Sequence, residues 1–283
     1  MKTCFVTAES LPQGYHEALR KLYLSDSREC TMLINITNPL QEPMISKCGM
    51  YTPESLEQYR QEILDGILDF EASTEKWDYT YHKRMARWKD DVVRILRETP
   101  ESRRAVIAIR DNEADMPSDN PACLQMLQYM IREGRLHCWA VMRSNDAPRA
   151  SFMNMFAFIM LQKEFAERLG VGVGEYTHFV TNYHVYEGEE EKELHKYAMR
   201  IASERVLTAL SLKAPDPLAI PYVGCWDALM ETEKPKIAAK VQKQYKKYQA
   251  ERKCCATCGR ECKVKEDPNA EKFCCFDFVR GEK

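Results

Sequence analysis

Residues 121–146 read PACLQMLQYMIREGRLHCWAVMRSND, and this stretch decides the fold that we expect for the chain. Two apolar runs, 124–131 and 136–142, flank a short polar connection that contains Gly134. This arrangement is typical of a β-hairpin with glycine in its loop. The stretch therefore predicts two neighbouring strands of a sheet.

Further helices and strands are expected on both sides of this hairpin. Apolar residues recur at helical spacing in four segments, and two more segments are short and apolar or alternate in polarity. In addition, Gly170 follows the long apolar segment at a position favoured after a helix end. Helices are predicted at 54–71, 90–97, 152–169 and 189–212, and strands at 105–109 and 176–186. This mixture indicates an α/β (α+β) protein.

The composition is that of an ordinary globular protein. Apolar residues make up 45% of the 283 residues, charged residues make up 30%, and the net charge is −2, which gives no general attraction to nucleic acid or membrane. The chain has no apolar run of eighteen residues and begins without the apolar stretch of a secretory signal. The twelve cysteines then suggest reduced thiols, metal ligands or a nucleophile, and a cytoplasmic location.

An ordered set of polar residues surrounds the hairpin. Cys123 precedes the first strand, Arg143-Ser144-Asn145-Asp146 follows the second, and Asn154, His184 and Tyr186 come later. A thiolate that adds to C6 of a pyrimidine makes C5 able to attack an electrophile. A nearby arginine favours the thiolate. Taken alone, a cysteine here is more often an inert buried thiol, so its neighbours carry the argument.

The order of these residues resembles thymidylate synthases and their relatives, the pyrimidine-nucleotide hydroxymethylases. That family has a Pro-Cys nucleophile, a strand with a glutamine (here Gln128), an Arg-Ser-x-Asp segment, an asparagine eight residues later and a His-x-Tyr pair. Residues 100–107 resemble its Asp-Pro-x-Ser-Arg-Arg segment. Residues 81–88 resemble its Tyr-Gly-x-x-x-Arg-x-Trp segment, with His82 in place of the glycine. The resemblance covers roughly residues 79–190 and implies a mixed sheet flanked by helices.

The resemblance also implies a role for each residue. Cys123 is the nucleophile, and Asp146 acts in catalysis and holds the pterin ring of 5,10-methylenetetrahydrofolate. Arg103 and Arg104 reach the phosphate of a partner subunit, so a homodimer is expected. Arg143 and Ser144 are implied to hold the nucleotide phosphate, and His184 and Tyr186 the sugar 3′-hydroxyl. Tyr81 and Gln128 are also implied in binding the nucleotide.

Asn154 is expected to choose the base. Its amide offers one donor and one acceptor, which match N3–H and O4 of uracil. Phage dCMP hydroxymethylases of this family have an aspartate at the matching position. The sequence therefore favours dUMP over dCMP as the substrate.

The last step of the reaction separates two members of the family. Synthases transfer hydride behind a closing C-terminal tail and an aromatic wall, whereas hydroxymethylases add water. Here the sequence ends Phe278-Val279-Arg280-Gly281-Glu282-Lys283, and Trp77 is the candidate for the wall. These differences favour formation of 5-hydroxymethyl-dUMP, which suits a phage that replaces thymine. The alternatives are a thymidylate synthase, a dCMP hydroxymethylase, and an inactive homologue that binds nucleotides or nucleic acid.

A helical glutamate is implied as the general acid and base of either reaction. Glu62 is the first choice, and Glu57 is the alternative.

The C-terminal part differs in kind from the rest. We expect a catalytic domain at 1–212, a linker and basic helix at 213–253, and a cysteine-rich appendage at 254–283. A Cys-x-x-Cys turn beside a glycine is typical of a structural zinc site. The basic helix is more often a solvated surface than a contact for nucleic acid. The candidate zinc ligands are Cys254, Cys255, Cys258, Cys262, Cys274 and Cys275.

Overall fold

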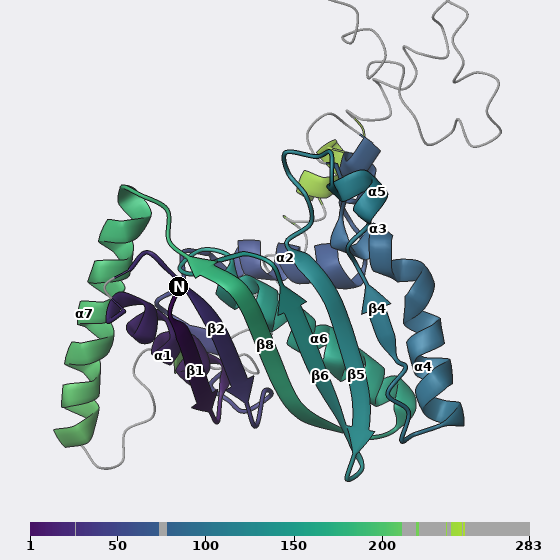
Figure 1. Cartoon of the computed structure of the whole chain (residues 1–283), viewed down its shortest axis with the longest axis horizontal. Helices are drawn as coiled ribbons and strands as arrows, with labels where there is room; N and C mark the ends of the chain where they lie inside the picture. Colours follow the sequence, from purple (N-terminus) through teal and green to yellow (C-terminus); the bar gives the residue numbers. More distant parts are fainter. Residues whose placement is uncertain are drawn as a thin grey trace, which may run out of the picture.

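A mixed sheet of seven strands runs through the described part of the chain. Six of them follow the order β1-β2-β8-β6-β5-β4 (Figure 1), and the short β7 pairs with β8. The structure is a computed structural model that describes residues 1–25, 27–73, 78–210, 219–220, 236, 239–244 and 246. The pairs β1–β2, β6–β8 and β7–β8 are parallel, and the others in this sheet are antiparallel. A mixed sheet is therefore confirmed.

The strands are short at the edges of the sheet and long at its centre. The bounds are Thr3–Ala8 for β1, Glu29–Ile36 for β2, Val106–Ala108 for β4, Leu124–Arg132 for β5, Arg135–Met142 for β6, Asn145–Asp146 for β7 and Gly172–His184 for β8. Two further strands, β3 (Ile45–Ser46) and β9 (Ala219–Ile220), pair with each other outside this sheet.

The predicted hairpin is formed by β5 and β6. Its turn places Glu133 at φ 51° and Gly134 at φ 69°. Two successive residues with positive φ are typical of the tight turn that joins twisted antiparallel strands. Because Leu124 pairs with Met142, the start of β5 lies beside the end of β6. The residues on either side of the hairpin are therefore brought to one edge of the sheet.

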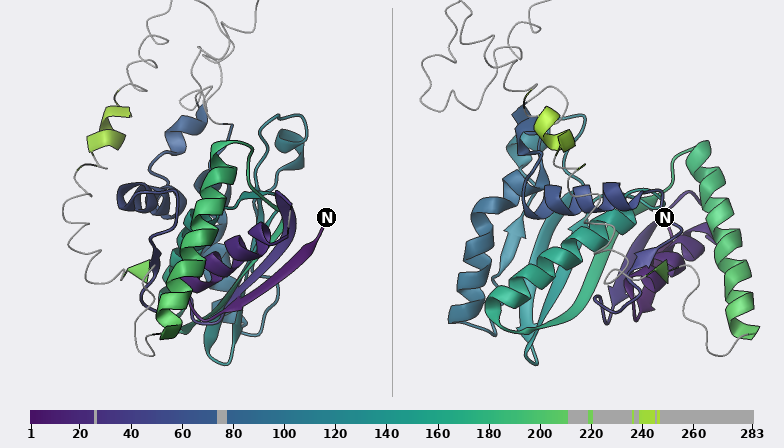
Figure 2. Two further views of the ribbon diagram at one scale, coloured as in Figure 1. Left: turned by 90° about the vertical axis from the view of Figure 1, so that its left-hand side faces the viewer. Right: turned by 180° about the vertical axis from the view of Figure 1, so that it is seen from behind.

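Helices cover one face of the sheet, as the view from behind shows (Figure 2). Helix α1 (Leu11–Tyr23) lies against β1 and β2, and α6 (Ser151–Leu169) lies against β6 and β8. Helix α2 (Pro53–Leu64) packs on α6, α4 (Lys89–Glu98) packs on α6, β4 and β5, and α7 (Glu189–Leu210) packs on α1. The shorter helices are α3 (Tyr81–Met85), α5 (Asn112–Asp115), η1 (Asp69–Ser73) and η2 (Ala86–Trp88).

Helix α6 is the centre of the core. Phe152, Phe156, Phe158 and Phe165 are fully buried on it, so it is apolar around most of its circumference, as a helix enclosed by sheet and helices must be. It ends at Gly170, which has φ 70° and closes the helix in the left-handed conformation. The predicted helix at 152–169 and its glycine cap are both confirmed.

The other face of the sheet is not covered by any described helix (Figure 1). Phe5, Trp139 and Val106 are 62%, 46% and 42% exposed on this face. We call it the open face. Alternate residues of each strand share one face of a sheet. One row across the open face consists of Thr7, Asn35, Thr177, Trp139, Gln128 and Val106.

Three predictions of secondary structure need correction. The helix predicted at 54–71 ends at Leu64, because the chain turns through Gly66 at φ 66° before η1. The strand predicted at 176–186 begins at Gly172 and ends at His184, so Tyr186 lies beyond it. The strand at 105–109 is shorter than predicted and lies at the edge of the sheet.

None of the described helices is both long and apolar enough to cross a membrane. Trp77, the cysteine-rich segment 254–283 and most of segment 213–253 lie outside the described residues.

Candidate active site

Cys123 lies directly before β5, and Arg143 lies directly after β6. The backbone N–H of Arg143 donates to the carbonyl oxygen of Cys123 at 2.9 Å. The guanidinium of Arg143 donates to the carbonyl oxygens of Ala122 at 3.0 Å and Pro121 at 2.6 Å. The hairpin thus brings the thiol and the guanidinium together, and Arg143 shapes the turn that presents the cysteine.

Two opposing effects act on the pKa of the half-buried Cys123 thiol. Burial raises this pKa, because it disfavours the thiolate, and the positive charge of Arg143 acts against burial. Burial is the larger effect, so the thiol form is favoured in the absence of a ligand. Arg143 is the group that stabilises the thiolate when it forms.

A buried ion pair supports the same turn from the other side. The backbone N–H of Ala122 donates to the Asp115 carboxylate at 3.3 Å. Arg84 binds both oxygens of that carboxylate at 2.7 and 2.9 Å. The hydrogen bonds from Arg84 hold the pKa of Asp115 well below its usual range. Asp115 was not among the predicted residues, because its role depends on a contact between segments far apart in the sequence.

Tyrosine side chains gather around Cys123. The backbone N–H of Leu124 donates to the Tyr81 hydroxyl at 3.1 Å, and the ring of Tyr79 lies 5.6 Å from that of Tyr81 between centroids. Burial raises the pKa of Tyr81 and Tyr59 well above the usual range, and a thiolate at Cys123 raises both further. These hydroxyls are therefore neutral donors beside the thiol.

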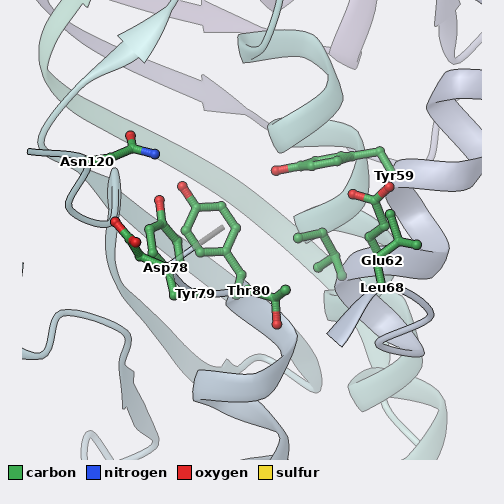
Figure 3. Close-up of a pocket in the computed structure, with 9 residues that line it drawn as sticks. Tyr59, Glu62, Leu68, Asp78, Tyr79, Thr80 and Asn120 are labelled. Atoms are coloured by element: carbon green, nitrogen blue, oxygen red, sulfur yellow. The ribbon is translucent and has the colours of Figure 1, made fainter. Parts of the chain in front are cut away.

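The tyrosines line a cavity of about 230 Å³ (Figure 3). Tyr59 and Glu62 enter it from α2, and Asp78, Tyr79 and Asn120 face them from the opposite side. Most of the lining side chains carry a carboxylate, hydroxyl or amide group, although Ile63 and Leu68 also contribute. The cavity can therefore hold a ligand with many polar atoms, or ordered water.

The two candidate glutamates of α2 have different surroundings. Glu62 lines the cavity, and its carboxylate accepts a hydrogen bond from Gln58 at 2.7 Å. Lys240 in turn donates to the oxygen of the Gln58 amide at 2.8 Å. Glu57 is 1% exposed and its carboxylate accepts bonds from Arg60 at 2.8 and 2.9 Å. The geometry therefore favours Glu62 over Glu57.

Asn154 extends from α6 toward the same group of side chains and is only 5% exposed. Its oxygen Oδ1 accepts a hydrogen bond from the Tyr59 hydroxyl at 2.5 Å. Its nitrogen Nδ2 donates to the sulfur of Met142 at 3.8 Å. Through Tyr59, Asn154 is connected to the cavity wall near Cys123.

A second cavity, of about 700 Å³, has Arg143 in its wall. Ser144, His184 and Arg28 line it together with Arg143. The Ser144 hydroxyl and Nδ1 of His184 are 3.4 Å apart. Two cations, a hydroxyl and an imidazole can bind a phosphate and the sugar next to it. Arg28 was missed because nothing in the sequence distinguishes it from a surface arginine, and it also forms an ion pair with Glu187.

Asp146 lies beside this group in β7, where it pairs with His184 of β8. Its carboxylate accepts the backbone N–H of Arg149 at 2.9 Å. Burial raises the pKa of Asp146, and the negative charge of Glu190 adds to this effect, while the Arg149 hydrogen bond and the charges of His184 and Arg149 lower it.

A buried histidine, His178, holds Asn145, which is the residue before Asp146. Nε2 of His178 lies 2.9 Å from Oδ1 of Asn145, and Nδ1 lies 2.9 Å from the Tyr176 hydroxyl. Burial lowers the pKa of His178 to about 3. The imidazole is therefore neutral and acts as a fixed link between β8 and the Arg143-Ser144-Asn145-Asp146 segment.

The remaining predicted residues lie apart from the two cavities. Arg103 and Arg104 are exposed before β4. The side chain of Gln128 lies on the open face and donates to the carbonyl oxygen of Arg103 at 3.0 Å. Tyr186 is 59% exposed, with its ring edge-on to that of His184 at 4.8 Å between centroids. Within one chain, Gln128 therefore does not line either cavity.

Among the described residues no cluster of three or more histidine, cysteine or acidic side chains could hold a metal ion. The six cysteines predicted to bind zinc, from Cys254 to Cys275, lie outside the described residues.

Comparisons with known proteins identify the family and the fold. The model of the thymidylate synthase family matches residues 53–241, which is more than half of the chain. A protein of Methanocaldococcus jannaschii named "Putative thymidylate synthase" is 29% identical over 178 residues, covering 58% of this chain and 78% of its own length. A protein of the same name from Methanosarcina acetivorans is 27% identical over 162 residues, covering 55% of this chain and 72% of its own length.

Among solved structures, thermostable thymidylate synthase A from Bacillus subtilis matches with a TM-score of 0.54 at 16% identity, covering 67% of this chain and 84% of that one. This similarity concerns the fold, which is the mixed sheet flanked by helices. The family match reaches beyond the 79–190 segment in both directions. The chain belongs to the thymidylate synthase family.

Proposed function

We propose that this member of the thymidylate synthase family transfers a one-carbon unit from 5,10-methylenetetrahydrofolate to C5 of dUMP and completes the reaction with water, which gives 5-hydroxymethyl-dUMP. Family membership supports the one-carbon transfer. The choice of dUMP and of water rests on the side chains of the two cavities.

The second cavity supplies the site for the nucleotide phosphate. Arg143 and Arg28 provide two guanidinium groups, and Ser144 adds a hydroxyl. Two N–H groups of Arg143 already hold the turn before Cys123, so phosphate binding and thiol orientation depend on the same side chain. His184 on the same wall is placed for the sugar, as the family resemblance implies.

Cys123 is the proposed nucleophile. Its thiolate forms a bond to C6 of the uracil ring, and the electron pair of the C5=C6 bond moves toward C5 and O4. Arg143 stabilises the thiolate that must form first. The folate supplies the electrophilic carbon that C5 attacks.

The residues of the first cavity fit a bound pterin. The rings of Tyr79 and Tyr81, whose centroids are 5.6 Å apart, provide flat apolar surfaces. Asp78 and Asn120 add polar groups of the kind that pair with ring nitrogens. Asp146, the residue first expected to hold the pterin, lies beside the second cavity in β7.

One observation carries the proposal that water completes the reaction. The cavity beside Cys123 has a carboxylate, Glu62, among tyrosine and threonine hydroxyls. A hydride transfer benefits from a wall that excludes water, whereas the hydroxyl and carboxylate groups among the apolar surfaces of this cavity can hold a water molecule next to a base. We assign Glu62 as the group that takes a proton from that water.

A second candidate is thymidylate synthase itself, which the names of the archaeal relatives favour. Both reactions use Cys123 in the same way and differ only in what reaches the carbon on C5. Hydroxymethylation of dCMP is a third candidate, and an inactive nucleotide-binding homologue is the one from a different class.

The open face of the sheet supports a homodimer. Phe5, Trp139 and Val106 are exposed there beside Leu33 and Phe179 of the neighbouring row. An apolar patch of this kind on an uncovered sheet marks an interaction surface. Arg103 and Arg104 lie at its edge, before β4, from which a partner subunit could place them at the phosphate.

Release of hydrogen from C5 tests the proposed class of reaction. The enzyme, dUMP labelled with tritium at C5 and methylenetetrahydrofolate should release tritium into water. The Cys123→Ser variant should release none. No release by the unmodified enzyme from dUMP or dCMP would favour the inactive homologue.

A further inference from the structure

The amide of Asn154 is held at both ends by neighbours that accept only one orientation. The Tyr59 hydroxyl donates to Oδ1 at 2.5 Å, and Nδ2 donates to the Met142 sulfur at 3.8 Å. The amide carries an acceptor on one side and a donor on the other. Because the side chain is 5% exposed, water has little access to replace either contact.

The chemistry of these contacts opposes a reversed amide. The Tyr59 hydroxyl donates to Oδ1, which can only accept, whereas Nδ2 can only donate. Burial keeps Tyr59 protonated, so its hydrogen needs an acceptor. Reversal would turn Nδ2 toward this hydroxyl and Oδ1 toward the lone pairs of the Met142 sulfur.

We propose that Tyr59 determines base selectivity by locking the Asn154 amide in a single orientation. This inference rests on the proposed function in one respect, which is that Asn154 pairs with the pyrimidine. It adds a residue that does not touch the base but decides which base the amide can read.

The chemistry of the two bases explains why a locked amide discriminates. Uracil presents a donor at N3 and an acceptor at O4, whereas cytosine presents an acceptor at N3 and a donor at N4. The two patterns are reversed, so an amide that can turn over pairs with either base. The position of the base is fixed independently, because Cys123 must reach C6 and Arg143 must hold the phosphate.

Loss of the contact between Tyr59 and Asn154 should reduce the discrimination between dUMP and dCMP, and not simply weaken the binding of both. In the Tyr59→Phe variant, the amide can reverse without leaving a buried hydroxyl unpaired. An unpaired buried donor costs a factor of about 10 to 100 in an equilibrium constant. The ratio of the dissociation constants for the two nucleotides should therefore move toward one by about tenfold or more.

The test measures dissociation constants for dUMP and dCMP by calorimetry, without folate, for the unmodified enzyme and its variants. Tyr15→Phe is the matched control, because it removes a buried tyrosine hydroxyl that donates to the carbonyl oxygen of Pro148 and not to Asn154. Met142→Leu removes the weaker contact and serves as a second variant if Tyr59→Phe does not fold, with a smaller change expected.

The outcomes separate this inference from the proposed function. A strong preference for dUMP that falls in Tyr59→Phe and persists in Tyr15→Phe supports both. A strong preference for dCMP that falls in the same way supports the lock and contradicts the proposed substrate. An unmodified enzyme without preference, or a Tyr59→Phe variant with an unchanged ratio, would overturn the lock.

Discussion

The backbone N–H of Arg143 donates to the carbonyl oxygen of Cys123 at 2.9 Å, which joins the end of β6 to the residue before β5. The guanidinium of the same arginine holds the carbonyl oxygens of Ala122 and Pro121. The proposed nucleophile and the proposed phosphate ligand therefore form one structural unit. A change at either residue is expected to affect both substrate binding and chemistry.

Replacing the nucleophile should abolish the reaction without unfolding the protein. Cys123→Ser is expected to lower the rate of tritium release from C5 of dUMP by on the order of 10⁴-fold or more, because a hydroxyl is a much weaker nucleophile near neutral pH. Cys138→Ser is the matched control, since Cys138 is buried in β6 away from the two cavities. Equal loss in both variants would contradict the assignment.

The reactivity of Cys123 should depend on pH and on Arg143. Burial raises the pKa of the thiol, so alkylation by iodoacetamide should rise with pH through neutrality and beyond the ordinary range of a cysteine. Arg143→Gln removes the charge that lowers this pKa, so its alkylation midpoint should lie at still higher pH. Arg149→Gln, which alters an exposed arginine, is the control. A pH midpoint of alkylation that is unchanged or lower in Arg143→Gln would contradict this prediction.

The ion pair of Arg84 and Asp115, which supports the segment just before Cys123, should be important for stability. Asp115 is 2% exposed and pairs with Arg84, so Asp115→Asn leaves a buried guanidinium without its charge partner. We expect a loss of about 3–5 kcal/mol in the free energy of unfolding. Asp91→Asn breaks an exposed pair with Arg94 and should cost about 1 kcal/mol or less. Chemical denaturation of both variants checks the difference.

The same pair predicts how stability changes in acid. The pKa of Asp115 is lowered in the folded state, so its contribution is present above the ordinary carboxyl pKa of about 3.9. That contribution should be lost as the pH falls through the lower folded value. The difference in the free energy of unfolding between the unmodified protein and Asp115→Asn should therefore shrink over that range. A difference that stays constant down to the lowest accessible pH would contradict this prediction.

The buried histidine should make the protein less stable in weak acid. Burial lowers the pKa of His178 to about 3, so the neutral ring contributes stability above the ordinary pKa of about 6.5 and loses it as the pH falls toward 3. Between pH 7 and pH 5 the loss should be about 2 kcal/mol. The stability advantage over His178→Gln should shrink by this amount, measured by urea denaturation. An equal advantage at both pH values would contradict a neutral buried ring.

The open face should be the contact between two subunits. Trp139→Glu places a charge at its centre, so the variant should sediment as a monomer where the unmodified protein sediments as a dimer. If the partner supplies the phosphate arginines, mixing the inactive variants Cys123→Ser and Arg103→Ala should restore activity. No recovery in mixed dimers would contradict a shared site.

The local parts of this fold could be predicted from the sequence. The β5–β6 hairpin and α6 were predicted because their periodicity and their glycines act over a few neighbouring residues. The helix at 54–71 was predicted too long, because the chain turns at Gly66 and His82, which is distant in sequence, leaves no room there for a side chain. A Cβ at Gly66 would lie 2.1 Å from Nδ1 of His82.

The parts of the site that depend on distant contacts could not be predicted. Arg28 and Asp115 reach the site only because β2 and α5 fold against elements far away in the sequence. Tyr59 is a helical tyrosine like many others until α2 packs on α6 and its hydroxyl meets Asn154. The N-terminal elements β1, α1 and β2 were not predicted, although they form one edge of the sheet.

The mass of the product from dUMP and methylenetetrahydrofolate tests the central claim most directly. The account predicts a nucleotide heavier than dUMP by one CH₂O unit, with tetrahydrofolate released and with dCMP unchanged in a parallel reaction. A product heavier by one CH₂ unit, together with dihydrofolate, would contradict the addition of water and identify the enzyme as a thymidylate synthase.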